Sequence, residues 1–378
     1  MKEKETGNSG EEIAPPMILQ DSPVSFNKFK HLRPMTEFSN IFNIEPDITL
    51  AKTLSAEFYL DNAYLQISKQ RIFARTWHLV DSSSIEGNLI PYTLLSGFLD
   101  KPLLLSKTKQ ETYCLSNVCT HRAKVLVEES ASGEKIRCGY HGRCFSLGGE
   151  FVSMPEFENA KNFPSEQDNL RNFPLEEWND FRFVALDPVA PLDHFLSEMT
   201  RKTEVFNFKD LRFVSKKDYE VNAHWALYCE NYLEGLHIPY VHKSLNKVLD
   251  YGNYTTETFR YSSLQTGFDD HGNVAAQYFF IFPNLMFNFY PWGISVNVVK
   301  PIRKDFTKVT YLTFVCDQSK LGDGAGADLE SVELEDQAVV ESVQNGIKSG
   351  FYQHGRYSPS REVGTHHFHR LICEFMNR

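Results

Sequence analysis

The sequence has no excess of basic residues. Its 378 residues include 39 Lys and Arg against 49 Asp and Glu, which gives a net charge of −10. Nucleic-acid binding relies on clustered Lys and Arg that neutralise phosphates. The composition therefore argues against a nucleic-acid partner, while it leaves room for electrostatic docking of a smaller protein.

Long uninterrupted apolar runs are also missing. Residues 1–20 are polar and acidic where the apolar core of a signal peptide would lie. The most apolar stretch, 278–299, is long enough to raise the question of a membrane span. Two prolines and three asparagines interrupt it: Pro283, Asn284, Asn288, Pro291 and Asn297. One spanning helix would not tolerate these residues together, so we expect no membrane segment and a cytoplasmic location.

Cysteine is too sparse for a disulfide scaffold. The seven cysteines are an odd number, spread over a chain too long to need one. Only Cys119 and Cys138 lie in a recognisable pattern. The others are interpreted as small buried apolar residues or free thiols: Cys114, Cys144, Cys229, Cys316 and Cys373.

Segments of different character follow one another in the first half of the chain. The length suffices for about two domains, and residues 1–45 are expected to form a loose leader. Apolar residues at helical spacing predict a helix over 55–75. Between 77 and 190, short β-rich runs alternate with Gly, Pro, Asn and Asp, which predicts a small antiparallel domain.

The second half, 191–378, has a mixed pattern. Residues 278–302 are expected to form three strands separated by Pro-Asn and Pro-Trp-Gly turns, and 308–317 a further strand. A helix is predicted over 334–349. The Gly-rich segment 321–328 lacks the strand–helix context and spacing of a dinucleotide fingerprint, so we interpret it as a linker.

Two short motifs each supply one cysteine and one histidine. Cys119 and His121 form Cys-x-His, and Cys138 and His141 form Cys-x-x-His, with 16 residues between the motifs. Such a set can hold zinc, or a [2Fe–2S] centre in which histidines replace cysteines on one iron. Zinc modules favour Cys–Cys and His–His pairs, so the mixed halves favour the iron–sulfur centre. Zinc, or two unrelated pairs, is the alternative.

A second group contains two histidines and acids. Glu234, His237 and His242 form Glu-x-x-His-x₄-His. Glu234 and His237 would share a helical face, whereas His242 would point elsewhere on an unbroken helix. Pro239 is expected to break the helix, so that both imidazoles converge. Two neutral histidines with a carboxylate form the facial triad that binds Fe(II) and leaves positions open for O₂.

Asp336 is the predicted carboxylate of this triad. On the predicted helix it shares a face with four apolar residues: Val339, Val340, Val343 and Ile347. It is therefore expected to point toward the core, while Glu335 and Glu341 diverge from it. A buried acid needs a charged partner or a metal. Glu333, three residues earlier, is the alternative ligand.

A third group, His366, His367 and His369, lies near the end of the sequence. No acid or cysteine accompanies these histidines in a ligand pattern. Packing or subunit contacts are therefore the preferred interpretation, with metal binding as the alternative.

The pattern C-T-H-R…C-G-Y-H-G resembles the Rieske domain of the ring-hydroxylating and related oxygenases. The passage from Asn231 to His242, followed by a distal aspartate, is similar to their catalytic domain. The resemblance covers roughly residues 50–378. Two positions depart from it: Ala123 stands where Gly is usual, and Arg143 stands where Trp often follows His-Gly. Neither residue supplies a ligand.

The resemblance implies an α+β fold. It implies a small antiparallel β Rieske domain over 77–190 and a catalytic domain over 191–378, in which helices surround an antiparallel sheet. The helix within 46–76 would pack on the catalytic domain. The cofactors implied are a [2Fe–2S] cluster on one ligand set, Cys119, His121, Cys138 and His141, and a mononuclear Fe(II) on another, His237, His242 and Asp336.

The resemblance also implies partners. Glu234 matches the carboxylate that links a cluster histidine of one subunit to an iron histidine of its neighbour, and Asn231 matches an asparagine beside the ligands. A head-to-tail homotrimer is implied. The sequence has neither a nucleotide fingerprint nor the Cys-x₄-Cys-x₂-Cys run of a ferredoxin. Electrons must therefore come from a separate NAD(P)H-dependent reductase or ferredoxin.

The passages E-N-Y-L-E-G-L-H and G-R-Y-S-P-S-R-E-V-G-T-H-H-F-H-R look most like the branch that oxidises choline, betaine and carnitine-type quaternary ammonium compounds. Four aromatic residues are candidates to cage such a cation, with core packing as the alternative: Phe287, Phe289, Tyr290 and Trp292. Two other functions stay open. One is an aromatic ring-hydroxylating dioxygenase, and the other is a Rieske electron carrier without oxygenase activity.

Overall fold

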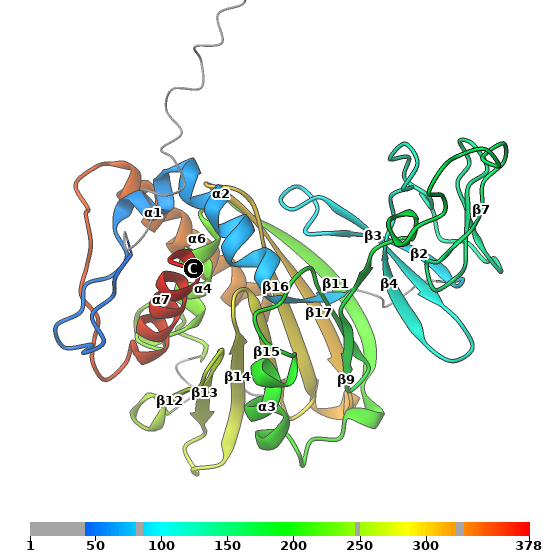
Figure 1. The fold of residues 1–378 in the computed structure, drawn as a ribbon. Coiled ribbons are helices and arrows are strands. Elements are labelled where there is room, and N and C mark those ends of the chain that lie inside the picture. The colour runs from blue at the N-terminus through cyan, green and yellow to red at the C-terminus, as the bar shows by residue number, and fades with distance from the viewer. Residues whose placement is uncertain (1–41, 81–85, 246–249, 322–328) are drawn as a thin grey trace, which may run out of the picture. The chain divides into compact units, whose positions relative to one another are not determined.

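The computed structural model describes residues 42–80, 86–245, 250–321 and 329–378. The predicted leader lies outside the described residues up to position 41, and the Gly-rich segment lies outside them from 322. Within these ranges, strands pair antiparallel in four sheets, accompanied by helices (Figure 1). The α+β prediction is confirmed.

Three small sheets lie between residues 77 and 185. The first has the order β1–β10–β9 (Trp77–Val80, Phe181–Ala185, Leu175–Trp178). The second has the order β2–β3–β4–β8 (Leu89–Leu94, Lys101–Lys107, Thr112–Ser116, Asn172–Phe173). The third has the order β5–β6–β7 (Ile136–Arg137, Cys144–Phe145, Phe151–Ser153). The loops that leave β4 and β5 carry the two Cys/His motifs.

The large sheet has seven strands in the order β11–β17–β16–β15–β14–β13–β12. In that order they span Arg212–Val221, Phe306–Val315, Gly293–Arg303, Leu285–Tyr290, Val274–Ile281, Ser262–Phe268 and Thr255–Thr258. The three strands predicted over 278–302 are β14, β15 and β16, and the next predicted strand is β17. Among the described residues, no helix is both long and apolar enough to cross a bilayer.

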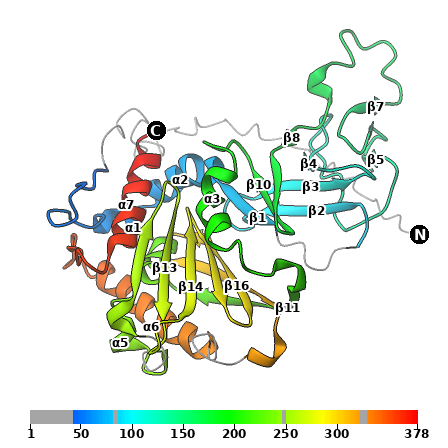
Figure 2. The ribbon, with the colours of Figure 1, turned by 90° about the horizontal axis from the view of Figure 1, so that it is seen from below.

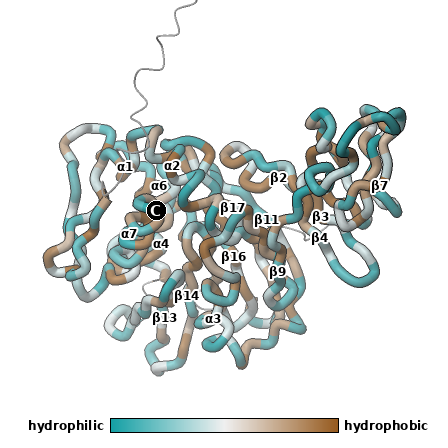
Figure 3. Tube along the Cα trace, in the orientation of Figure 1, coloured by the Kyte–Doolittle hydropathy of each residue, from teal (hydrophilic) through white to brown (hydrophobic). Residues whose placement is uncertain are grey.

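The large sheet is covered on both faces at its centre. Every residue of β15 is buried, and brown, hydrophobic stretches run along β14 and β16 in Figure 3. Phe287 packs edge-on against Trp178 and Phe181 from the β1–β10–β9 sheet, with ring centroids 5.7 and 5.3 Å away. A strand buried on both faces explains why 278–302 reads as nearly continuous apolar sequence.

The segment predicted as one helix over 55–75 forms two helices and a turn. They are α1 (Ala56–Leu60), α2 (Asn62–Arg71) and a 3₁₀ turn at Phe73–Arg75. The break falls at Asp61, which is extended and whose side chain accepts the N–H of Ala63 at 2.8 Å. An aspartate that caps the second helix ends the first, because an N-cap residue takes non-helical angles.

The remaining helices surround the large sheet. They are α3 (Asp193–Lys202), α4 (Trp225–Tyr232), α5 (Ile238–Val241), α6 (Leu329–Lys348) and α7 (Val363–Met376). Helix α4 contacts β16, α6 contacts β11, and α7 contacts β12. Figure 2 shows α7 at the end of the sheet near β13. The predicted helix over 334–349 is α6, and it begins five residues earlier because Leu329 and Glu330 also favour helix.

Candidate functional site

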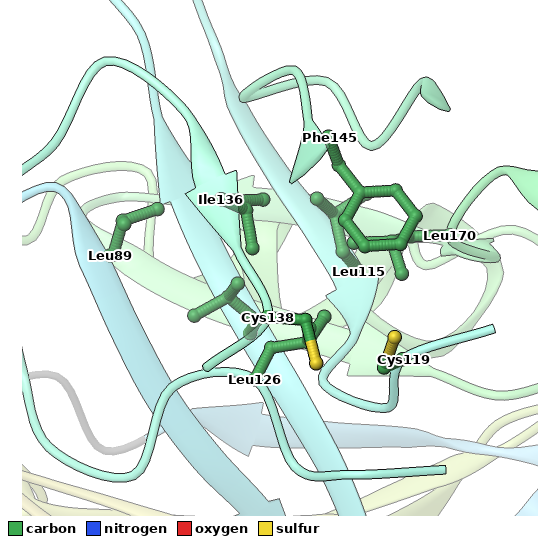
Figure 4. Close-up of a cluster of buried hydrophobic side chains, with 9 residues drawn as sticks. Leu89, Leu115, Cys119, Leu126, Ile136, Cys138, Phe145 and Leu170 are labelled. Atoms are coloured by element: carbon green, nitrogen blue, oxygen red, sulfur yellow. The ribbon is translucent and has the colours of Figure 1, made fainter. Parts of the chain in front are cut away.

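The two cysteines of the first ligand set lie in one apolar cluster. Cys119 and Cys138 are 3% and 2% exposed. The cluster's other members are Leu89, Leu104, Leu115, Leu126, Ile136, Phe145 and Leu170. Figure 4 shows the two sulfur atoms close together at one edge of this cluster. Because the cysteines come from two separate loops, the packing of the small domain brings their sulfurs together.

The sulfur of Cys119 is surrounded by donors. Burial raises the pKa of the Cys119 thiol, the neighbouring thiol of Cys138 adds to this, and the backbone N–H groups of His121 and Arg122 oppose it. N–H groups aimed at a buried sulfur stabilise a thiolate. They are also the hydrogen bonds that tune an iron–sulfur cluster. Two N–H donors are thus in place for a metal-bound thiolate, while burial raises the pKa of the free thiol.

The two histidines of this set lie beside each other and are half-buried. The rings of His121 and His141 have centroids 4.8 Å apart and stand at 73°. Sulfurs in the core and imidazoles nearer to solvent are the arrangement expected for a cluster with both histidines on the outer iron. The four residues therefore fit a Rieske cluster.

Ala123 shows why glycine is usual at its position. Its φ is 55°, in the left-handed region that side chains with a Cβ rarely adopt. Its N–H donates to the carbonyl of Cys119 at 3.0 Å, which closes the ligand loop into a tight turn. The alanine keeps the turn at the cost of some backbone strain.

The second ligand set begins where helix α4 ends. The imidazole Nδ1 of His224 accepts the N–H of Ala226 at 3.3 Å and caps the start of this helix. The helix stops at Tyr232, so Glu234 lies beyond it in a turn. The prediction that Glu234 and His237 share a helical face is wrong. Pro239 also does not break a helix, because it lies in the first turn of α5, where proline is well tolerated.

Glu234 holds this turn together. Its carboxylate accepts the N–H of Leu236 and, at 3.2 Å, that of His237. Its Oε1 also lies 2.7 Å from Nδ1 of His237. Gly235 is required here, since a Cβ would come within 2.8 Å of the Tyr254 ring. The turn therefore fixes the His237 ring from behind and leaves its Nε2 free to face the site.

Three ligand atoms converge at the centre of the site. Nε2 of His237 and Nε2 of His242 are 3.2 Å apart. Oδ1 of Asp336 lies 2.9 Å from His242 Nε2 and 3.6 Å from His237 Nε2. The three atoms all lie within 4.8 Å of one another, and they form the one such group found among the described residues. Two imidazoles and a carboxylate are the donor set of a facial iron triad.

Glu335 lies at the site although the sequence reasoning placed it elsewhere. Its Oε2 lies 2.7 Å from Nδ1 of His242, although Glu335 was expected to diverge from the site. Burial alone would lower the pKa of His242, but the Asp336 and Glu335 carboxylates outweigh it and raise the pKa. A carboxylate behind a metal-binding histidine fixes the ring and its tautomer. The His242 ring lies between two adjacent residues of α6, so that Asp336 contacts its Nε2 and Glu335 its Nδ1.

Glu333, the alternative ligand, has different partners. It is 1% exposed and accepts hydrogen bonds from the hydroxyls of Tyr228 and Tyr311. Burial raises the pKa of Glu333 to about 7, the two tyrosines oppose this, and Asp336 adds to it. Its carboxylate is not among the three converging ligand atoms.

A pocket opens beside the triad. It holds about 740 Å³ of empty space, part of it open to solvent. Six tyrosines line it: Tyr228, Tyr232, Tyr254, Tyr278, Tyr290 and Tyr311. Three asparagines and a glutamine also line it: Asn231, Asn288, Asn297 and Gln265. Asn231 thus lies at the pocket wall together with His237, His242 and Asp336.

The four candidate cage residues divide between the two faces of β15 and the turn after it. Tyr290 lines the pocket, and Trp292 stacks behind it with ring centroids 5.0 Å apart. Phe287 and Phe289 are core residues instead. Since side chains alternate along a strand, the polar pair Asn288 and Tyr290 could have been assigned to the pocket from sequence.

Two of the three histidines of α7, His366 and His369, have polar partners within the fold. Nε2 of His366 lies 2.8 Å from the carbonyl of Glu45. Burial lowers the pKa of His367 to about 4. His369 is fully buried and lies 2.7 Å from the Tyr357 hydroxyl and 3.1 Å from Glu230. These contacts support the packing interpretation.

Comparison with known families identifies two domains in the chain. A profile of the Rieske [2Fe-2S] domain matches residues 91–164, and one of the ring hydroxylating alpha subunit (catalytic domain) matches 208–276 and 252–378. Together they cover more than half of the chain. The chain belongs to the Rieske non-haem iron oxygenases. This oxidoreductase therefore has a Rieske [2Fe–2S] cluster and a mononuclear iron as its cofactors.

Individual relatives are similar over nearly the whole chain. Choline monooxygenase, chloroplastic, from Arabidopsis thaliana is 28% identical and covers 88% of this chain and 85% of its own length. The carnitine monooxygenase oxygenase subunit of Escherichia coli (strain K12) is 27% identical, with 88% and 98% covered.

Solved structures give the same result for the fold. The quaternary ammonium Rieske monooxygenase CntA in complex with L-carnitine matches with a TM-score of 0.71 and 25% identity, and 88% of this chain and 97% of that chain are covered. A naphthalene 1,2-dioxygenase matches with a TM-score of 0.70 at 17% identity, over 90% and 95% of the two chains. The latter likeness concerns the fold alone.

Proposed function

We propose that this Rieske oxygenase is a monooxygenase that hydroxylates or N-dealkylates a quaternary ammonium compound. The observation that carries the proposal is the tyrosine-lined pocket beside His237, His242 and Asp336. The two named relatives that act on choline and carnitine support it.

Four of the tyrosines are arranged as a cage. The rings of Tyr278 and Tyr290 have centroids 6.0 Å apart at 79°, and those of Tyr232 and Tyr278 are 6.5 Å apart at 88°. Tyr254 completes the group on the pocket wall. Burial raises the pKa of each of these hydroxyls, so the rings stay neutral. Neutral aromatic faces set at right angles attract a desolvated cation.

The charges that line the pocket favour a cation without a carboxylate. Glu234 and Asp336 are the charged side chains at the described pocket wall beside the two histidines, and neither Lys nor Arg is among its lining residues. A carboxylate on the substrate would lack a cationic partner there, which is costly in a buried site. We therefore expect choline-type compounds to be better substrates than carnitine and betaine.

In this proposal each ligand residue has one task. Cys119, Cys138, His121 and His141 hold the cluster. His237, His242 and Asp336 hold the iron, which when bound supplies the site where O₂ is activated. The carboxylates behind the two histidines orient their rings, and the pocket tyrosines position the substrate next to the iron ligands.

The assembly is part of the same proposal. Glu234 would connect a cluster histidine of one subunit to His237 of the next, with Asn231 beside it, in a head-to-tail homotrimer. Electrons would come from a separate NAD(P)H-dependent reductase or ferredoxin. The domain limits at 76/77 and 190/191 are proposed on the same basis. A cytoplasmic location is also proposed, to be tested by fractionation, since the plant relatives are named as chloroplastic.

The test is product analysis of the iron-loaded enzyme. The pre-reduced protein receives choline, L-carnitine, glycine betaine or naphthalene with O₂, and products are identified by mass spectrometry. We expect oxygenated or demethylated product from choline above all. Hydroxylated naphthalene alone would favour the ring-hydroxylating alternative, and no product from any substrate with intact reducible cofactors would favour the electron carrier.

A matched pair of variants tests the cage. Tyr290→Leu removes a ring from the pocket and is expected to raise KM for choline about 5- to 30-fold, because an aromatic face contributes on the order of 1–2 kcal/mol to a desolvated cation. Tyr290→Phe keeps the ring and is expected to keep most of the affinity. Equal KM values for the two variants would contradict the cage.

A further inference from the structure

Behind the cluster loops lies a buried ion pair for which the ligand set gives no reason. Arg143, at the position where the family often has Trp, is 2% exposed. Its Nη2 donates to Oδ1 of Asp168 at 2.6 Å, and the Asp168 side chain is 19% exposed. A buried charge is costly to place, so a pair at this position invites a functional explanation.

The surroundings of Arg143 are aromatic. Its guanidinium carbon lies 5.8, 5.0 and 5.4 Å from the ring centroids of Phe145, Phe151 and Phe163. Little water can screen the charge there, so its field extends further than that of a surface arginine. Arg143 follows the cluster ligand His141 by two residues, so this charge lies beside the second cluster loop.

Hydrogen bonds to backbone carbonyls connect the pair to both cluster loops, through Asp168 to the first and through Arg143 to the second. The backbone carbonyl of Asp168 accepts the hydroxyl of Thr120, between the first two ligands, at 2.8 Å. The carbonyl of Arg143 accepts the N–H of Cys138 at 2.8 Å in the second loop. Burial would raise the pKa of Asp168, but hydrogen bonds from Arg143 and Ser165 outweigh it and lower the pKa, so the carboxylate is ionised. Arg143 and Asp168 therefore carry opposite charges, and these hydrogen bonds hold them in one position next to the cluster loops.

We propose that the Arg143–Asp168 pair sets the reduction potential of the Rieske cluster, with Arg143 raising it and Asp168 limiting the rise. Reduction adds one electron, and hence one negative charge, to the cluster. The buried positive charge of Arg143 stabilises that reduced form, and the partly buried negative charge of Asp168 opposes it. Neither residue is a metal ligand in this proposal, and each acts on the cluster through its charge.

The test is a redox titration of the assembled enzyme, followed by the visible and electron paramagnetic resonance spectra of the cluster. Arg143→Gln is expected to shift the midpoint to a more negative value. Asp168→Asn, which keeps the backbone carbonyl that binds Thr120, is expected to shift it to a more positive value. Arg122→Gln is the matched control, because Arg122 is exposed and its charge is screened. It should shift the midpoint in the negative direction by much less than Arg143→Gln.

Opposite shifts in the two pair variants are the signature of a charge effect. A purely structural role would lower thermal stability in both variants and leave the midpoints at the wild-type value, which would overturn the proposal. A midpoint shift for Arg143→Gln no larger than for Arg122→Gln would also overturn it. If Arg143→Gln does not assemble a cluster, Asp168→Asn alone tests the proposal. A positive shift of its midpoint potential would support the proposal, and an unchanged midpoint would overturn it.

Discussion

The ligands of the cluster come from two loops separated by 16 residues of sequence, whereas the iron ligands His242 and Asp336 lie 94 positions apart. In the first site two sulfurs are part of an apolar core, and a few short strands hold both loops. In the second, the seven-stranded sheet separates the turn after α4 from α6 along the chain and brings them together in space. The cluster site is local and the iron site depends on the whole catalytic fold.

This difference predicts that the two sites can be broken separately, and the largest effect is expected at the iron. Asp336→Ala removes the carboxylate of the triad, so we expect loss of the mononuclear iron and of turnover. The cluster spectrum should stay unchanged, because its ligands draw on other loops. Iron analysis and the visible spectrum of the purified variant check this.

Glu333→Gln is the control for that experiment. Glu333 is three residues from Asp336 but binds Tyr228 and Tyr311, so its amide should keep the iron. If Glu333→Gln loses the iron while Asp336→Ala keeps it, the ligand assignment is wrong by one helical turn.

A smaller effect is expected behind the iron ligands. Glu335→Gln weakens the carboxylate that holds Nδ1 of His242, and removing such a partner typically lowers metal affinity about 10- to 100-fold. Competition for iron with a chelator measures this loss. Glu330→Gln, on the same helix but paired with Lys217, should bind iron like the wild type. Equal affinity in Glu335→Gln and the wild type would remove Glu335 from the site.

The cluster ligands have the clearest local pattern in the sequence, because each loop contains its own Cys/His pair. The strands β14 to β16 followed from the Pro-Asn and Pro-Trp-Gly turns, and β17 from the β-rich run at 308–317. Glu335 was missed because a helical wheel shows only which residues face the core. It cannot show that the His242 ring lies between Glu335 and Asp336 and contacts both. The end of α4 at Tyr232 was also missed, since Leu233 and Glu234 favour helix and only the fold places Glu234 in a turn.

The pocket was predictable only in part. Tyr290 follows from strand alternation, but Tyr228, Tyr254, Tyr278 and Tyr311 come from different elements. Nothing local in the sequence brings them to one wall. Their meeting depends on the strand order of the large sheet, which pattern reasoning does not supply.

The smallest expected effect concerns the stability of the helix that leads into the iron site. Burial lowers the pKa of His224 to about 3, while an unfolded histidine takes up its proton near pH 6.5. The unfolded state therefore binds more protons between these values, so stability falls as the pH falls through this window. From pH 6.5 to 5 the loss is about 2 kcal/mol.

His224→Asn tests this titration. Asparagine is a good N-cap and does not titrate, so the variant should lose less thermal stability between pH 7 and pH 5 than the wild type. Thermal unfolding midpoints at the two pH values measure the difference. Equal losses in the two proteins would show that His224 does not contribute to the acid sensitivity.

The central claim is that the two metal sites work as one enzyme, connected through Glu234. Glu234→Gln keeps one oxygen, which can still accept the backbone N–H groups of the turn, while an NH2 group replaces the oxygen beside Nδ1 of His237. The fold should therefore remain, and the iron site should fill when the variant is loaded with excess iron. The decisive measurement is product formed in a single turnover by the pre-reduced variant. The account predicts about three irons per chain, a reducible cluster and at least tenfold less product than the wild type. Near-wild-type product would contradict the connection, and loss of iron would make Glu234 a ligand instead.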